Sequence, residues 1–99
     1  MGKETLKCPK DSRYRVELDA SEAYPNDPGQ GTPAMVYGPK GASATFFCAL
    51  DTGEMDSHEG PHEIPSNIYR WLESVEERVD GFVSRAFEDA RARAAGGGV

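Results

Sequence analysis

The longest periodic segment of the chain is residues 65–90, PSNIYRWLESVEERVDGFVSRAFEDA. Apolar residues recur in it at spacings of three and four, which is typical of one face of an α-helix. They are Ile68, Trp71, Leu72, Val75, Val79, Phe82, Val83, Ala86, Phe87 and Ala90. Pro65 suits a first helical turn, where the amide hydrogen it lacks would have no partner. The sequence therefore predicts a C-terminal helix over about residues 65–94, whose charged side is interpreted as a solvated face.

The length of this helix raises a packing problem. About 26 helical residues span about 39 Å, whereas a strand of eight residues spans about 26 Å. A straight helix would then carry Phe82, Val83 and Phe87 into water. Three alternatives follow. The helix is kinked or broken, with Ser74 and Gly81 as candidate positions; a second copy of the chain covers these side chains in a homodimer; or neither applies.

Residues upstream of the helix show the two-residue period of β-strands. Side chains alternate strictly between apolar and polar over residues 13–20, and shorter runs at 33–38 and 43–50 are separated by segments rich in proline and glycine. We therefore predict an α+β fold, in which a three-stranded antiparallel sheet packs against the long helix. Residues 1–12 are interpreted as a flexible polar leader, 13–95 as a single domain and 96–99 as a flexible tail.

The third predicted strand makes specific assignments for its side chains. Alternation places Phe46, Cys48 and Leu50 toward the core, so Cys48 is interpreted as a small buried residue. Phe47 then points to the outer face of the sheet, either with Met35 and Tyr37 or with Ala34 and Val36. That face is a candidate docking surface.

Composition narrows the class of partner. The 99 residues include 17 acidic and 11 basic side chains, giving a formal charge of −6. This charge repels nucleic-acid phosphates and favours basic protein partners. Two cysteines in unlike contexts form no disulfide framework, and no apolar run approaches the length of a membrane span. We therefore expect a cytoplasmic protein without direct nucleic-acid or membrane binding.

Acidic residues concentrate in two connections of the predicted sheet. In a three-stranded meander, the connections after the first and third strands leave from the same end. That topology gathers nine carboxylates, from Glu17, Asp19, Glu22, Asp27, Asp51, Glu54, Asp56, Glu59 and Glu63. Together with Phe47 on the sheet, they form the predicted partner-binding site. The alternative is that these carboxylates serve only solvation.

The leading interpretation is a small interaction or regulatory protein without enzymatic activity. It would bind a basic partner through the acidic surface, the outer sheet face, or both. In a sharper version the carboxylates mimic nucleic-acid phosphates and inhibit a nucleic-acid-binding protein.

The competing interpretation is a hydrolase or metal-binding protein that uses residues 51–63. Asp51-Thr52-Gly53 follows an apolar run and resembles the catalytic signature of retroviral-type aspartic proteases, which implies Asp51 as a proton-sharing carboxylate. The resemblance covers about six residues and does not continue into the barrel strands of that family. His58 and His62 add metal-binding groups, but Gly53 stands at the third position of the ligand order that an EF-hand requires, and Cys8 and Cys48 lack the short spacing of a zinc finger. No metal or cofactor is therefore expected.

Overall fold

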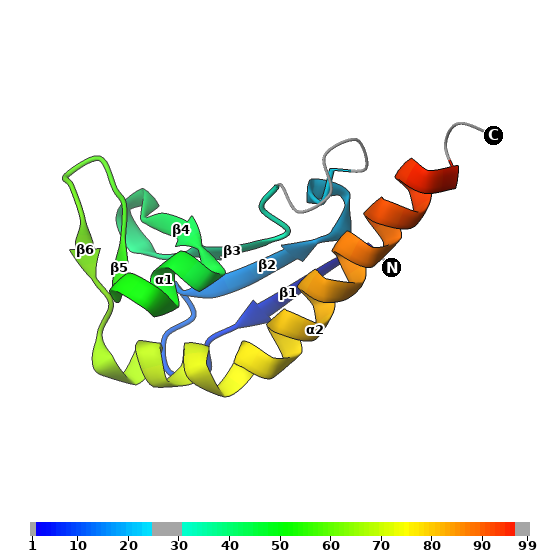
Figure 1. The fold of residues 1–99 in the computed structure, drawn as a ribbon. Helices are drawn as coiled ribbons and strands as arrows, with labels where there is room; N and C mark the ends of the chain where they lie inside the picture. The colour runs from blue at the N-terminus through cyan, green and yellow to red at the C-terminus, as the bar shows by residue number, and fades with distance from the viewer. Residues whose placement is uncertain (1, 25–30, 97–99) are drawn as a thin grey trace.

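The computed structural model describes residues 2–24 and 31–96 of the chain. Strands β1 (Lys3–Lys7), β2 (Arg15–Asp19), β3 (Ala34–Tyr37) and β4 (Ser43–Thr45) form an antiparallel sheet in sequence order. The other elements are the short 3-10 helices η1 (Ala20–Glu22) and η2 (Pro39–Gly41), helix α1 (Phe46–Thr52), the hairpin of β5 (Glu54–Met55) and β6 (His62–Glu63), and helix α2 (Ser66–Gly96) (Figure 1). The predicted α+β class with one long C-terminal helix is confirmed.

Strand β1 is the first correction. Residues 1–12 were interpreted as a leader, yet Lys3–Lys7 pairs antiparallel with β2 and makes the sheet four-stranded. The pairing places Leu6 beside Val16 and Glu4 beside Leu18 on the inner face. Because only one side chain of β1 on that face is apolar, the sequence of β1 shows little alternation. Its place in the sheet depends on the pairing with β2 instead.

The second correction concerns the predicted strand over residues 43–50. Strand β4 ends at Thr45, and α1 begins at Phe46 because the Thr45 hydroxyl accepts a hydrogen bond from the Cys48 amide at 3.4 Å. Phe46 and Ala49, three residues apart, are the buried residues of this helix. Cys48 is therefore exposed instead of packed in the core, and the buried cysteine is Cys8.

One face of the sheet carries the core. Both α1 and α2 pack on the side that presents Val16, Leu18 and Val36, and these side chains are at most 1% exposed. Phe46 from α1, with Ile68, Leu72 and Val79 from α2, completes the set of largest buried side chains. Burial of each such side chain contributes about 1.5–3 kcal/mol relative to leaving it in water. The core therefore fixes α1 and α2 next to each other on the sheet.

Helix α2 is continuous across both candidate break points. It runs unbroken from Ser66 to Gly96, and Figure 1 shows that it changes direction after its first turns. The Ser74 hydroxyl donates a hydrogen bond to the carbonyl of Trp71 at 2.6 Å, a local bond of the kind that bends helices. The helix is thus bent but not broken.

The packing problem of the long helix is solved inside the chain. Helix η1 and the residue that follows it lie beneath the second half of α2, where Ala23, Ala86 and Ala90 are completely buried. Small side chains on both elements allow this close contact. Phe87 is partly buried against this alanine contact, whereas Phe82 and Val83 are partly buried against the main core. Their partial burial therefore requires neither a break in the helix nor a second copy of the chain. The predicted tail is Gly96, the last helical residue, followed by residues outside the described ranges.

Candidate protein-interaction surface

The eight predicted carboxylates that lie within the described residues do not gather at one end of the sheet. Asp56 exchanges backbone hydrogen bonds with Ser43, and Ser43 pairs with Tyr37, which pairs with Arg15 at the start of β2. Asp19 lies at the opposite end of β2. The prediction fails because α1 turns the chain back, so that the β5–β6 hairpin lies at the end of the sheet away from η1 (Figure 1). Glu59 is exposed between the two strands of this hairpin, and Asp27 lies outside the described residues.

Glu17 lies on the outer face of the sheet and is engaged within the molecule. Its carboxylate accepts a hydrogen bond from Arg15 Nε at 2.6 Å, and the Arg15 guanidinium lies 4.8 Å from the centre of the Tyr37 ring. Met35 shares this face with Tyr37, as one of the two predicted alternatives required. Phe47 does not share it, because Phe47 belongs to α1. Arg15 and Glu17 on the outer face are therefore partners of each other.

Asp19 has a local structural role. Its carboxylate accepts hydrogen bonds from the Ser21 hydroxyl at 2.6 Å and the Ser21 amide at 3.0 Å, and it lies 3.7 Å from Lys3 Nζ. The Ser21 hydroxyl, followed by the Ser21 amide and Lys3, lowers the pKa of Asp19 below its ordinary value. Glu22 lines a shallow cavity next to Asp19 and Glu17. Asp19 thus caps η1, and this group lies apart from the predicted carboxylates of the β5–β6 hairpin.

Asp51, Glu54 and Glu63 lie on the side of the molecule where α1 ends against α2. Glu54 and Glu63 are paired across the β5–β6 hairpin and line a cavity of about 510 Å³ together with Glu73 and Arg70 of α2. Asp51 is exposed on the last turn of α1. The structure thus brings two of the predicted residues, Glu54 and Glu63, together with Glu73 on the charged side of the helix.

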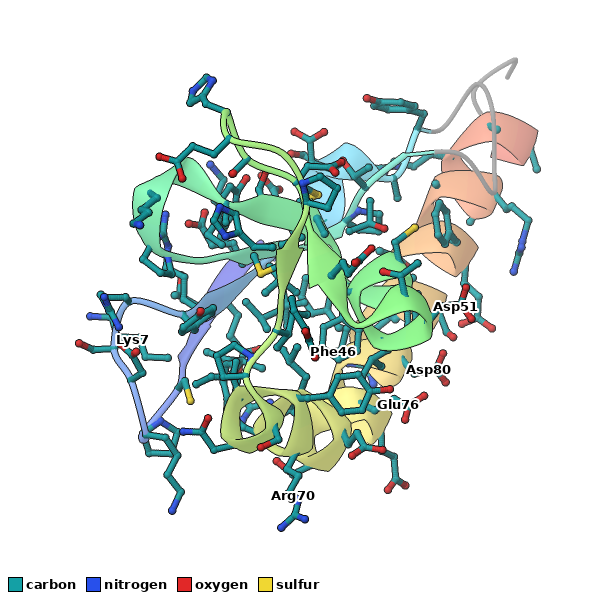
Figure 2. The ribbon with its side chains drawn as sticks, turned by 90° about the vertical axis from the view of Figure 1, so that its left-hand side faces the viewer. Lys7, Phe46, Asp51, Arg70, Glu76 and Asp80 are labelled. Carbon is teal, nitrogen blue, oxygen red and sulfur yellow. The ribbon has the colours of Figure 1, made fainter. Side chains whose placement is uncertain are left out.

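Helix α2 extends this acidic group along α1. The Tyr69 hydroxyl donates a hydrogen bond to the carbonyl of Leu50 at 2.6 Å, which identifies the side of α2 that borders α1. Glu73, Glu76 and Asp80 follow Tyr69 by four, seven and eleven residues, so they lie on the same side of the helix. Figure 2 shows Asp51, Glu76 and Asp80 projecting on one side of the molecule.

Sequence reasoning missed these three helical residues. Their positions fit an ordinary solvated face, and no sequence motif distinguishes them from the other charged residues of α2. The only usable signal is their spacing from Tyr69, and that spacing acquires meaning only when the position of α1 is known.

The opposite side of α2 carries cations. Arg78 lies two residues after Glu76, about 200° further around the helix, and forms an ion pair with Glu4 of β1. Arg85 follows Arg78 by seven residues and lies on the same side. Over residues 73–85, helix α2 therefore presents carboxylates on the side of α1 and guanidinium groups on the opposite side, where Arg78 contacts β1; Asp89, four residues after Arg85, adds a carboxylate to that opposite side further along.

An apolar pocket continues the acidic side. Phe47, Val83 and Phe87 line a cavity of about 190 Å³ at the start of α1. Phe47 is 39% exposed and contacts Phe46 edge to face, with 5.3 Å between ring centres. This exposed ring, with the carboxylates of Asp51, Glu54, Glu63, Glu73, Glu76 and Asp80, forms what we call the acidic-aromatic surface.

The Asp51-Thr52-Gly53 tripeptide has a structural explanation. The Thr52 hydroxyl donates a hydrogen bond to the Cys48 carbonyl at 2.9 Å, and the Gly53 amide donates to the Ala49 carbonyl at 2.9 Å. Gly53 has a φ of 71°, the left-handed conformation that ends many helices. These residues form the C-terminal end of α1, whereas the signature that they resemble follows a strand.

The two histidines lie on the β5–β6 hairpin and the turn that joins its strands. His58 is exposed, whereas His62 is half-buried and lines a cavity of about 190 Å³ with Tyr14 and Met55. Within residues 2–24 and 31–96, no group of three or more histidine, cysteine, aspartate or glutamate side chains is arranged to hold a metal ion. The hairpin therefore supplies no assembled metal centre in the part of the chain that the structure describes.

Two further findings concern the whole described chain. None of its helices is long and apolar enough to cross a membrane. Comparison with protein-family models, with curated proteins and with solved structures yields no match to this chain.

Proposed function

We propose that this chain is a small, non-enzymatic binding protein that recognises a basic, partly apolar segment of a partner protein. The acidic-aromatic surface is the binding site in this proposal. The observation that supports it best is the sorting of charge on α2, which leaves carboxylates beside α1 and pairs Arg78 with Glu4 on the other side.

Electrostatics favour a cationic partner at this surface. Among the described residues, Asp51, Glu76 and Asp80 take part in no ion pair, and no lysine or arginine occurs between Gly41 and Tyr69. Neighbouring carboxylates repel each other because they carry the same charge. A basic segment relieves this repulsion on binding and is attracted from a distance at low ionic strength.

The apolar pocket gives the surface a place for an anchor residue. Partly buried aromatic pockets beside charged rims are where binding energy concentrates in protein interfaces. From Glu76 to Phe87 the helix rises by about 16 Å. A partner helix of about three turns, with cations at one end and an apolar side chain at the other, matches this length.

The outer sheet face supports a docking role less well. Its charged residues Arg15 and Glu17 already form an ion pair, and Arg15 also covers the Tyr37 ring. A partner there would have to displace these internal contacts. We therefore assign the proposed interaction to the acidic-aromatic surface.

Two narrower statements belong to the same proposal. If the basic segment of the partner is its nucleic-acid-binding region, this chain would act as an inhibitor, and duplex DNA would compete with it for the partner. The free thiols of Cys8 and Cys48 suit a reducing compartment, so we infer that the binding takes place in the cytoplasm.

The test compares two variants that change net charge equally. The site variant carries Asp51→Asn, Glu76→Gln and Asp80→Asn, and the control carries Glu59→Gln, Glu88→Gln and Asp89→Asn at other exposed positions. Each variant and the native chain are immobilised, and partners are captured from the native host at low and physiological salt. We expect the partner to be retained by native and control chains, to be lost from the site variant, and to bind more weakly at the higher salt. Equal retention by both variants would exclude this surface.

A further inference from the structure

A second cavity lies across α2 from the acidic-aromatic surface. It has a volume of about 460 Å³ and is formed where the β1–β2 connection meets the first turns of α2. Pro9 and Lys10 line it from the connection, and Ser66, Arg70 and Trp71 line it from the helix. A volume of this size falls in the range of small-molecule sites.

The charge of this cavity is opposite to that of the chain as a whole. The full lining is Pro9, Lys10, Ser66, Asn67, Arg70, Trp71 and Ser74, which includes two cations and no carboxylate. Lys10 and Arg70 come from separate segments, and neither forms an ion pair among the described residues. Figure 2 shows Arg70 projecting away from Glu76 and Asp80. In a protein with a net charge of −6, this concentration of positive charge needs a specific explanation.

The cavity also offers an apolar wall and hydrogen-bonding groups. The Trp71 side chain is half-buried against the core and leaves part of its indole at the cavity. An indole ring accepts a flat apolar group by stacking or edge contact. The planar guanidinium of Arg70 matches the oxygens of phosphate or carboxylate, and Ser66 adds a hydroxyl. Because α2 begins at Ser66, the positive end of the helix dipole lies at the same wall.

We propose that this cavity binds a small ligand that carries an oxyanion, phosphate or carboxylate, on a flat aromatic body. Lys10 and Arg70 hold the oxyanion, and the aromatic body lies against Trp71. Arg70 and Ser66 also line the 510 Å³ cavity of Glu54, Glu63 and Glu73, so the ligand site adjoins the acidic-aromatic surface, whereas Lys10 and Trp71 line the ligand cavity without lining that acidic one.

Trp71 makes the proposal directly testable, because it is the only tryptophan in the chain. Phenyl phosphate is titrated into the native protein while tryptophan fluorescence is excited at a wavelength that phenyl phosphate does not absorb. We expect a saturable change in emission that shifts to higher ligand concentration as salt is added. Absence of a saturable change up to about 10 mM phenyl phosphate would overturn the proposal.

Two variants and two controls locate the oxyanion contacts. Lys10→Gln and Arg70→Gln should each weaken binding about tenfold, the usual loss when one charge-assisted hydrogen bond is removed. Lys7→Gln and Arg85→Gln remove exposed cations that do not line the cavity, and they should leave the affinity unchanged within about twofold. Unchanged affinity in both cavity variants, or equal losses in the controls, would contradict the assignment.

Small probes separate the parts of the proposed ligand. Benzyl alcohol lacks the charge and should bind at least tenfold more weakly than phenyl phosphate, and inorganic phosphate lacks the ring and should also bind more weakly. Equal affinity for either probe would overturn the combined site. Benzoate is titrated in parallel, and tighter binding of phenyl phosphate or of benzoate assigns the oxyanion to the phosphate or the carboxylate class.

Discussion

The two long sides of α2 differ in charge although they belong to one helix. The side that borders α1 presents Glu73, Glu76 and Asp80, whereas the side that borders β1 presents Arg78, paired with Glu4, and Arg85. Helical periodicity describes both sides as a single solvated face. The difference shows that the neighbours of a helix, rather than its own pattern, decide which charged residues form a surface with a shared function.

The position of α1 underlies this comparison, and Phe46 holds α1 in place. Phe46 is completely buried and Phe47, its neighbour in sequence, is 39% exposed. Phe46→Ala should lower the free energy of unfolding by about 3–5 kcal/mol, because it removes a large side chain and leaves a cavity. Phe47→Ala should lower it by less than about 1 kcal/mol. Urea unfolding of both variants measures the contrast, and similar losses would mean that α1 is not anchored as described.

The C-terminal half of α2 is held in place because it packs on η1. Ala86 is completely buried against Ala23, so Ala86→Leu should overpack this contact and lower the free energy of unfolding by about 1–3 kcal/mol. Ala92→Leu places the same side chain at an exposed position of the same helix and should have almost no effect. Thermal unfolding at equal protein concentration gives both values. A harmless Ala86→Leu would show that α2 extends freely beyond the sheet.

Tyr69 provides the one side-chain hydrogen bond between the two helices among the described residues. Tyr69→Phe removes the hydroxyl that binds the Leu50 carbonyl and should lower the free energy of unfolding by about 0.5–1.5 kcal/mol. Amide hydrogen exchange in the last turn of α1 should accelerate in the variant. Unchanged exchange at Leu50 and Asp51 would show that the Tyr69 hydrogen bond does not hold the end of α1 against the acidic side of α2.

Removing charge from the two sides of α2 should change the free energy of unfolding in opposite directions. Glu76→Gln with Asp80→Asn removes a repelling pair spaced by four residues and should raise the free energy of unfolding by about 0.2–0.5 kcal/mol at low salt. Arg78→Gln with Arg85→Gln removes the ion pair to Glu4 and should lower it by a similar amount. Urea unfolding at low and high salt tests both, since screening should abolish the two effects. Shifts of the same sign would refute the sorting of charge.

The sequence alone predicted the elements with strong periodicity. The apolar stripe of α2 and the alternation around β2 extend over enough residues to identify a helix and a strand. The strand predicted over residues 43–50 was wrong beyond Thr45. Phe46, Cys48 and Leu50 satisfy a two-residue period, but Phe46, Ala49 and Leu50 equally satisfy a helical one. Strand β1 was not predicted because Leu6 is its only apolar inner residue, and its place in the sheet depends on pairing with β2.

The candidate site was predictable only in part for the same reason. The sequence identified four members of the surface: Phe47, Asp51, Glu54 and Glu63. Their identification assumed a three-stranded meander, and α1 interrupts that topology. Glu76 and Asp80 join them through the fold of the helix on α1, which no local pattern encodes. Short helices inserted after a strand are thus the step at which topological inference from sequence breaks down.

The proposed binding surface can be mapped directly by NMR with a defined probe. The isotope-labelled chain is titrated with a synthetic amphipathic peptide of about three helical turns that carries lysines and leucines at helical spacing, and in parallel with a peptide in which glutamate replaces lysine. We predict amide shift changes confined to α1, to Glu54 and Glu63 of the β5–β6 hairpin and to residues 69–87 of α2, only with the lysine peptide, and weaker at high salt. Changes centred on Glu17, Met35 and Tyr37, or equal responses to both peptides, would contradict the acidic-aromatic surface.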